Sequence, residues 1–156
     1  MTDEIVKELI ERIHLELDEI PRVLARMHEG WERFRRSHDD YYLDGVALNL
    51  HGFYMGIERI LTRIAETIDG DLPRSENWHL LLLQQMSVEV PGIRPAVIST
   101  ETGMKLDEYR RFRHVVRNVY THDFDPVKIG KLVSSASELF TQTKVELLAF
   151  AAFIDQ

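Results

Sequence analysis

Cysteine is absent from this 156-residue sequence, and so is any long apolar run. The first absence excludes disulfide bonds, thiolate metal sites and a cysteine nucleophile, and it is compatible with a reducing compartment. The second argues against a membrane-spanning helix, which needs about 20 apolar residues in a row. The chain begins with the acidic segment 1–4 rather than a basic one, so no signal peptide is expected. We therefore expect a cytoplasmic protein that has no membrane partner.

An excess of positive charge is also missing. The chain has 26 acidic residues against 19 lysines and arginines, which gives a formal net charge of −7. An acidic protein repels polyanions at long range, so binding of nucleic acid through bulk charge is disfavoured. Any contact with nucleic acid must therefore be local.

Several common chemical motifs are missing as well. The sequence contains no glycine-rich phosphate loop with a lysine, no His-Glu-x-x-His zinc pair and no Gly-x-Ser-x-Gly elbow. Di-metal helical bundles use Glu-x-x-His pairs. Glu11 and His14 have that spacing, but we do not recognise the full set of ligands that a di-metal site needs. We expect neither a metal nor a cofactor.

The apolar residues that are present recur every three, four or seven positions, which is typical of helices with one buried face. The first run begins after Thr2, whose hydroxyl can cap a helix, and continues to Phe34. Pro21 removes one backbone donor inside this run. We expect either a kinked helix or two short helices that join near Glu19 and Ile20.

A second run predicts a helix from about residue 40 to residue 68, because Gly70 and a proline follow it as a stop and a break. Ser75 is the candidate cap of a short third helix that ends near Met86. The segment 91–95, Pro-Gly-Ile-Arg-Pro, is expected to form a rigid, exposed loop.

Ser99 or Thr100 is expected to begin an arginine-rich helix. The apolar face of this helix has Leu106, Tyr109, Phe112, Val116 and Val119. Its polar face has Arg110, Arg113, His114 and Arg117. Asp125 and Pro126 suit the cap and first position of a last helix. Together these runs predict an all-α fold, an antiparallel bundle of four long helices and a short one, with residues 1–156 as a single domain.

The segment 109–122 stands out in this acidic chain because it contains four arginines and two histidines. Such a cluster either pairs with structural carboxylates or holds a specific phosphate. Exposed ion pairs are the ordinary outcome, and this interpretation is strongest for Arg110 and Arg111. The nearby carboxylates are Asp107, Glu108, Asp123 and Asp125.

Other residues in and around this segment also have structural explanations. His122 can interact with the exposed carbonyls of a helix end, and Tyr120 can be a buried aromatic with one bonded hydroxyl. We expect His51 and His114 to be packing residues with satisfied hydrogen bonds, and Trp78 to belong to the core.

An arginine and a histidine stand five residues apart in Arg117-Asn118-Val119-Tyr120-Thr121-His122, with a polar residue directly after the arginine. This pattern resembles the signature of the HEPN superfamily (higher eukaryote and prokaryote nucleotide-binding), specifically of the HepT-like toxins. The resemblance implies a helical bundle that forms a homodimer, in which paired Arg-x4-His elements form a metal-independent endoribonuclease site. It also implies a partner, an MntA-like nucleotidyltransferase antitoxin that neutralises the toxin.

The same spacing occurs twice more, and two other segments add to the resemblance. The additional Arg-x4-His matches are Arg33 with His38 and Arg74 with His79. Asn118 and the location at the expected end of a bundle helix favour the third match. The segments 50–54 (Leu-His-Gly-Phe-Tyr) and 78–79 (Trp-His) look like sequences in one HepT-like subset, and we assign them no role.

One residue departs from the family pattern. The best-known branch extends the signature to Arg-x4-His-x-Tyr, and its antitoxin attaches adenylate to that tyrosine. Phe124 occupies this position here, so adenylylation cannot occur there. Control would then need Tyr120 as a modification site, another residue, or steric blocking. The alternative function is a catalytically inactive HEPN-like module that binds a nucleotidyltransferase partner or a nucleotide.

The spacing also constrains the geometry. On one straight helix, Arg117 and His122 would lie about 140° apart around the axis and about 7.5 Å apart along it, so both would not reach one phosphate. Either the helix ends between them, or a two-fold dimer brings both arginines and both histidines into one cleft.

The residue types suit metal-free RNA cleavage. The reaction needs a base for the 2′-hydroxyl, a proton donor for the departing 5′-oxygen and cations for the phosphorane. We assign the proton transfers to His122 and the phosphate to Arg117, with Asn118 orienting the phosphate or the imidazole. Further phosphate or RNA contacts are expected from Arg113, Arg110 and His114. Because the 2′-hydroxyl attacks, RNA is cut and DNA is spared, and the product end is a cyclic 2′,3′-phosphate.

Overall fold

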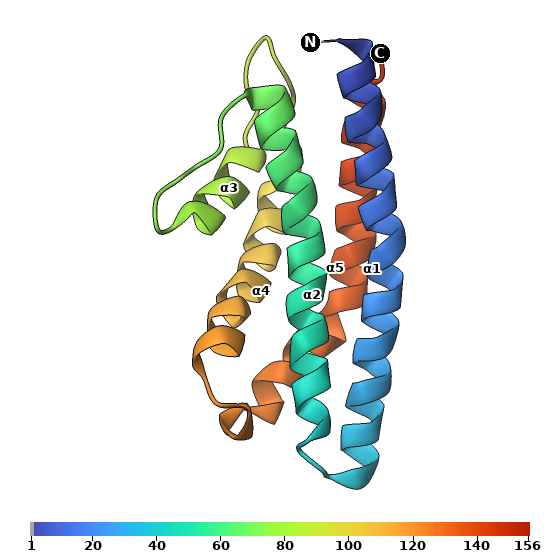
Figure 1. The fold of residues 1–156 in the computed structure, drawn as a ribbon, viewed down its shortest axis with the longest axis vertical. Helices are drawn as coiled ribbons and strands as arrows, with labels where there is room; N and C mark the ends of the chain where they lie inside the picture. Colours follow the sequence, from blue (N-terminus) through green and yellow to red (C-terminus); the bar gives the residue numbers. More distant parts are fainter. Residues whose placement is uncertain (1) are drawn as a thin grey trace.

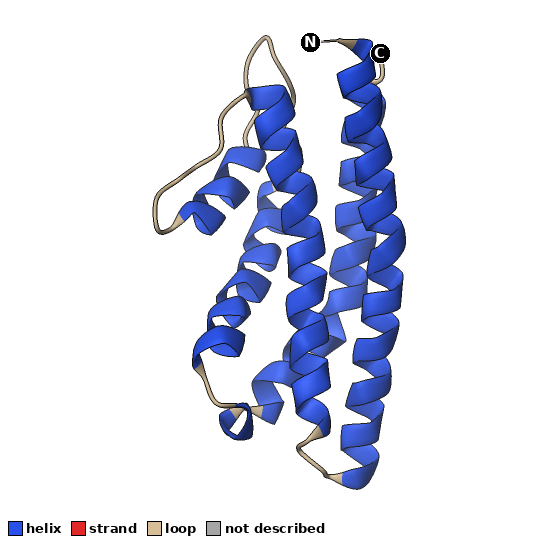
Figure 2. Cartoon of the chain, in the orientation of Figure 1, coloured by secondary structure: helices blue, strands red, loops and turns tan. Residues whose placement is uncertain are grey.

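The computed structural model describes residues 2–156 and is all-helical (Figures 1 and 2). The long helices are α1 (Asp3–Ser37), α2 (Tyr42–Ile64), α4 (Thr100–Asn118) and α5 (Pro126–Ile154). A short helix, α3 (Trp78–Met86), lies between α2 and α4 in the chain. Within residues 2–156 the only β-type pairing is an isolated bridge between Val90 and Arg94. The predicted bundle of four long helices and a short one is confirmed.

The long helices alternate in direction. In Figure 1, α1 runs down, α2 runs up, α4 runs down and α5 runs up, so that α1 begins and α5 ends at the same end of the bundle. α1 packs mainly against α2 and α5, whereas α3 packs against α4. No helix within residues 2–156 has the length and apolar character needed to cross a membrane.

Pro21 lies inside α1, which the structure shows as one continuous helix from Asp3 to Ser37. The alternative of two short helices is therefore wrong. The buried side chains on both sides of the proline explain this result: Leu17 and Ile20 before it and Leu24 and Met27 after it all join the same core. That continuous apolar face offsets the loss of one backbone hydrogen bond.

Most of the expected helix ends are confirmed. Thr2 accepts a hydrogen bond from the Ile5 amide, Ser99 from Thr102, and Asp125 from Val127, with a proline in the first turn of α5. The second run continues beyond α2 as a π-helical turn, η1 (Ala65–Asp69), and Gly70 ends it with a φ of 67°.

The cap that we expected for α3 is wrong. Asn77, not Ser75, precedes its first residue, and no side chain caps it. The Ser75 hydroxyl instead donates to the side-chain oxygen of Asn77 at 2.6 Å, so it is not free for the helix.

The centre of the core is aromatic. The Phe53 ring packs edge-to-face on Tyr109 at 5.3 Å and on Phe140 at 6.4 Å, which joins α2, α4 and α5. The Tyr109 hydroxyl donates to the Leu132 carbonyl at 2.7 Å and lies 2.9 Å from Ser135 Oγ. Burial raises the pKa of Tyr109 to about 12, so this hydroxyl stays protonated and keeps α4 bonded to α5.

The loop 91–95 is not exposed along its whole length, which corrects the sequence prediction. Arg94 turns inward, and its side chain has no exposed surface. Its guanidinium forms two hydrogen bonds with the carboxylate of Asp69, at 2.6 and 2.8 Å, and further bonds with backbone carbonyls. An arginine can be buried here because all of its charge and donors are satisfied.

Candidate functional site

The arginine-rich helix ends inside the Arg-x4-His motif. α4 stops at Asn118, and Val119 takes an extended conformation with φ −114° and ψ 138°. Tyr120 is also extended, and a single 3₁₀ turn, η2 (Thr121–Asp123), precedes α5. One of the two alternatives from the sequence, that the helix ends between Arg117 and His122, is therefore confirmed. Arg117 leaves the last turn of α4 and His122 leaves the following turn, so a straight helix no longer separates them.

The helix end also corrects the predicted apolar face. Leu106, Tyr109 and Phe112 are buried as expected, but Val116 is only half-buried and Val119 is exposed. Val119 lies beyond the last helical residue, where the 3.6-residue period no longer applies.

The two named catalytic candidates are accessible. Arg117 is exposed and has no carboxylate within 4.0 Å among residues 2–156. The His122 side chain is 74% exposed, and its Nε2 lies 3.7 Å from the carboxylate of Asp123. The imidazole stacks on the ring of Tyr120, with 5.6 Å between centroids and 12° between planes. His122 lies in η2, beyond the last residue of α4, and no hydrogen bond joins its ring to a carbonyl at that helix end within the described residues.

Asn118 contacts a different histidine from the one in the motif. Its amide donates to the backbone carbonyl of His114 at 2.8 Å, and the same nitrogen lies 3.1 Å from His114 Nδ1. His114 is exposed, so it is not a packing residue, although its Nδ1 has the Asn118 amide as a hydrogen-bonding neighbour, in line with the expected satisfied histidine. Asn118 therefore fixes an imidazole on the last turn of α4.

The arginines of α4 divide into two groups. Arg110 and Arg111 both pair with Asp107, at 2.5 and 3.3 Å, which is the structural role that the sequence left open for them. Arg113 and Arg117 form no ion pair within the described part of the chain. Arg113 is half-buried, and its Nε is buried without an acceptor.

The structure distinguishes the three Arg-x4-His matches. In the first, Arg33 is paired with Glu29 at 2.8 Å. In the second, His79 is mostly buried, with its Nδ1 2.7 Å from Glu58 Oε2. Of the three matches, only Arg117 and His122 combine a guanidinium without a carboxylate partner among the described residues and an imidazole that is open to solvent.

Phe124 and Tyr120 have opposite environments. Phe124 is buried and packs near Phe112, with 6.4 Å between ring centroids. Tyr120 is 76% exposed, which contradicts its interpretation as a buried aromatic. The residue that replaces the family tyrosine is thus a core residue, and the nearest tyrosine hydroxyl is accessible.

A set of polar side chains gathers behind the helix end, between α2, α3 and α4. We call it the inner polar cluster, and it consists of His51, Tyr54, Glu58, His79 and Arg113. Glu58 is only 3% exposed and is hydrogen-bonded to His79, whose ring stacks on Trp78 with 3.7 Å between centroids. Three buried polar atoms within residues 2–156 lack a hydrogen-bond partner, and all three belong to this cluster: His51 Nδ1, Tyr54 Oη and Arg113 Nε.

Burial shifts the pKa values of two residues of this cluster, His51 and Tyr54. Burial, and then the charges of Arg113 and Arg117, lower the pKa of His51, although Glu58 acts in the opposite direction. Burial and the Glu58 carboxylate raise the pKa of Tyr54. His51 is therefore neutral at neutral pH and lies within electrostatic reach of the candidate catalytic arginine. The expectation that His51 is a satisfied packing residue is wrong, because its Nδ1 has no partner.

Sequence reasoning did not assign this cluster, although it noted the segments 50–54 and 78–79 that supply much of it. The signal was the co-occurrence of polar residues at positions 51, 54 and 58, which are three and four apart and therefore lie on one face of α2. Trp78 is only half-buried and packs against the core instead of belonging to it, which corrects the expectation from the sequence.

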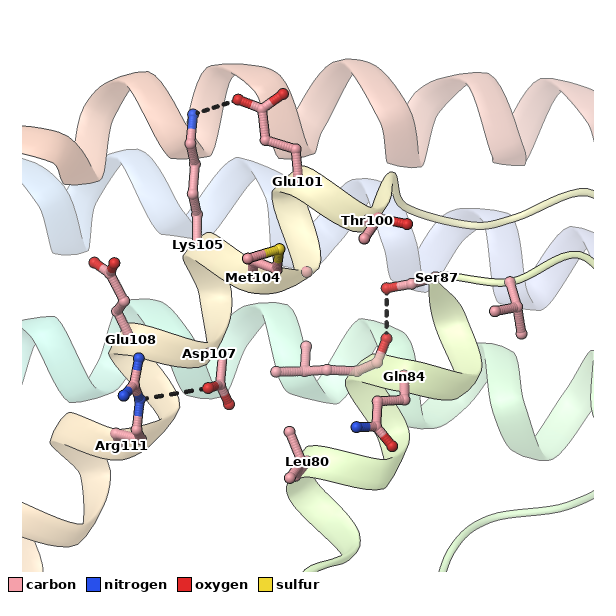
Figure 3. A pocket seen from close by; sticks show the side chains of 13 residues that line it. Leu80, Gln84, Ser87, Thr100, Glu101, Met104, Lys105, Asp107, Glu108 and Arg111 are labelled. Carbon is pink, nitrogen blue, oxygen red and sulfur yellow. Dashed lines mark hydrogen bonds and ion pairs between the residues drawn. The ribbon is translucent and has the colours of Figure 1, made fainter.

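A hollow of about 590 Å³ lies between α3 and α4 (Figure 3). Its lining includes Leu80 and Met104, and four of its charged groups are paired, Lys105 with Glu101 and Arg111 with Asp107. Glu108 is the remaining charged residue in the lining, and no histidine accompanies it. Among residues 2–156 no three histidine, aspartate or glutamate side chains gather as metal ligands.

Comparison with protein families places this geometry in a known group. A family model described as HepT-like protein matches residues 45–154, which is well over half of the chain. The chain belongs to the HepT-like family. Comparisons with curated proteins and with solved structures find no match.

The matched range of this HepT-like chain contains every residue of the candidate catalytic site and of the inner polar cluster. It includes α3, α4, α5 and nearly all of α2, whereas α1 precedes it. The resemblance to the HEPN superfamily inferred from the motif is thereby confirmed at the level of the family.

Proposed function

We propose that this HepT-like protein is a metal-independent endoribonuclease toxin whose site is formed by Arg117, Asn118 and His122. One observation carries the proposal. Of the three Arg-x4-His matches, only this one has an accessible imidazole and an arginine without a carboxylate partner among the described residues. The helix end between them gives each side chain its own backbone direction.

The chemistry follows from these groups. An imidazole takes the proton from the 2′-hydroxyl, the 2′-oxygen attacks phosphorus, and an imidazolium gives a proton to the departing 5′-oxygen. The guanidinium of Arg117 stabilises the charge of the phosphorane with its fixed pair of donors. Arg113, one turn earlier on α4 and without a carboxylate partner in residues 2–156, supports an adjacent phosphate.

A two-fold homodimer would complete the site, since a second copy supplies the second imidazole that the two proton transfers use. Sedimentation or light scattering should then give a mass of about twice the 18.3 kDa of one chain. One hydrophobic core joins α1 to the matched helices, which supports residues 1–156 as a single HepT-like domain within each subunit.

The proposed partner is a nucleotidyltransferase antitoxin, in the cytoplasm where the RNA targets are. Tyr120 supports this part of the proposal, because its exposed hydroxyl beside His122 is a chemically suitable acceptor for adenylate. Addition there would place a bulky anion directly against the catalytic imidazole.

The second candidate function is a binding module without nuclease activity. It is favoured by Phe124, which occupies the position where the best-known branch of the family has its modified tyrosine. Phe124 has no hydroxyl to modify, and its side chain is part of the core. Such a module would bind the nucleotidyltransferase partner or a nucleotide through the same surface.

One experiment distinguishes the endoribonuclease from the binding module. Purified protein is incubated with total RNA in the presence of a chelator, and cleavage is measured. We expect cleavage that leaves cyclic 2′,3′-phosphate ends, with His122→Ala and Arg117→Ala slowing it by about 10²- to 10⁴-fold, the usual range for loss of a positioned acid–base group. The matched control is Arg33→Ala with His38→Ala, which removes the same spacing elsewhere and should retain activity. No cleavage by the unsubstituted protein would reject the enzyme and favour the module.

A further inference from the structure

Another hollow is bounded by residues of α1, α2, η1, α3 and α4. Its volume is about 570 Å³, which is within the range of sites that hold nucleotide-sized ligands. We call it the arginine pocket, and the residues that matter below are Arg12, Glu58, Arg63, Trp78, His79 and Arg113.

The charges of the arginine pocket favour an anion. Four arginines and three glutamates line it, so it has an excess of positive charge in a chain whose net charge is −7. Two of the glutamates are already engaged: Glu16 accepts hydrogen bonds from Arg59 at 2.9 and 3.3 Å, and Glu58 is bonded to His79. Glu66 is the remaining carboxylate in the lining.

Three of the pocket's arginines have guanidinium N–H donors that are not used in ion pairs with carboxylates of the described residues. Arg12, Arg63 and Arg113 form no ion pair within residues 2–156. Guanidinium groups bind phosphate oxygens through paired donors, so three of them around one hollow suit a phosphate-bearing ligand.

The pocket also has an aromatic wall. Trp78 and His79 lie ring on ring with 3.7 Å between centroids, and the buried Glu58 holds His79 in place through a 2.7 Å hydrogen bond. A fixed aromatic surface beside phosphate-binding arginines has the composition of sites for single-stranded nucleic acid, in which bases stack on rings and basic groups follow the backbone.

Arg113 connects the arginine pocket with the candidate catalytic site. It lines the pocket, and it lies one helical turn before Arg117 on α4. We propose that the arginine pocket is a substrate subsite, which binds one nucleotide of a single-stranded RNA whose neighbouring phosphate lies at Arg117. This proposal rests on the proposed nuclease function, because that function supplies the RNA.

The pocket can be tested separately from the chemistry with an RNA that cannot be cut. Binding of a fluorescent oligoribonucleotide with 2′-O-methyl groups throughout is followed by anisotropy. We expect Arg63→Gln and Arg12→Gln each to weaken binding by about fivefold or more, and Trp78→Leu by about 5- to 100-fold, the range for one base stacked on an aromatic ring.

Arg22→Gln, an exposed arginine of α1 outside the pocket, is the matched control and should bind normally. Unchanged binding by both arginine variants would overturn the proposal, even if Trp78→Leu fails to fold. Failure of the unsubstituted protein to bind the oligomer would also overturn it, and arginine-dependent binding of adenosine 5′-monophosphate alone would identify a free nucleotide instead. Arginine-dependent binding without any cleavage of natural RNA would leave the pocket in place and reject the nuclease.

Discussion

At the scale of single residues, Arg94 and Arg117 show how burial and charge pairing distinguish a structural arginine from a functional candidate. Arg94 is fully enclosed and bonded to Asp69 and three carbonyls, whereas Arg117 is exposed without a carboxylate among the described residues. By itself burial would raise the pKa of Asp69, but the hydrogen bonds from Arg94 and Gln85 lower it below its ordinary value. The first arginine therefore stabilises the loop 91–95, and the second remains available for a ligand.

Arg94→Ala should destabilise the protein by about 3–5 kcal/mol, because it leaves the carboxylate of Asp69 in a partly buried site without its counter-charge. The free energy of unfolding in urea measures this loss. The matched control is Arg35→Ala, whose exposed partner Glu32 is 3.9 Å away and which should cost at most about 0.5 kcal/mol. Equal losses for the two variants would show that Arg94 is not a structural residue.

At the scale of the elements, close packing limits which side chains each helix tolerates. Gly130 of α5 lies against Trp31 of α1, and a Cβ at that position would be 2.9 Å from two atoms of the indole ring. Gly45 of α2 has nothing within 4 Å of such a Cβ. The two glycines therefore have different roles, although both are helical. The first permits close approach of α1 and α5, and the second only weakens its helix.

Gly130→Ala and Gly45→Ala should consequently change stability in opposite directions. We expect the first to cost about 1–3 kcal/mol through overpacking against a rigid ring. The second should stabilise by about 0.5–1 kcal/mol, since alanine loses less conformational entropy than glycine in a helix. Thermal or urea unfolding of both variants checks this pair. A stabilising Gly130→Ala would contradict the close contact between α1 and α5.

At the scale of the whole molecule, the inner polar cluster makes folding sensitive to pH. Burial, and then the charges of Arg113 and Arg117, lower the folded-state pKa of His51 below 6.5, so the unfolded chain takes up the proton first as the pH falls. The contribution of a neutral His51 to stability is fully present above pH 6.5. It is lost progressively as the pH falls from there toward the lower folded-state pKa.

His51→Gln should therefore flatten the pH dependence of the free energy of unfolding between pH 7.5 and 5, since glutamine does not titrate. Chemical denaturation of both proteins at several pH values in this window gives the comparison. If the two profiles fall in parallel as the medium becomes more acidic, His51 is not the group responsible.

The sequence alone determined the helices, most of their caps and the identity of the motif at 117 and 122. These features depend on neighbours within a few residues: the 3.6-residue period, the hydroxyl of Ser99, the carboxylate of Asp125 and the glycine that ends η1. The family was recognisable for the same reason, because its signature is a short stretch of chain.

Only the tertiary structure decided which arginines and histidines are paired with carboxylates. Arg94 meets an aspartate 25 residues away, and His79 meets a glutamate 21 residues away, so no local pattern reveals either pairing. The arginine pocket and the orphaned atoms of the inner polar cluster likewise arise where α1, α2, α3 and α4 pack together. Burial and charge pairing depend on segments brought together by packing. For this reason the sequence could name Arg117 and His122, but it could not show that, of the three Arg-x4-His matches, only this one has both an arginine without a carboxylate partner among the described residues and an exposed histidine.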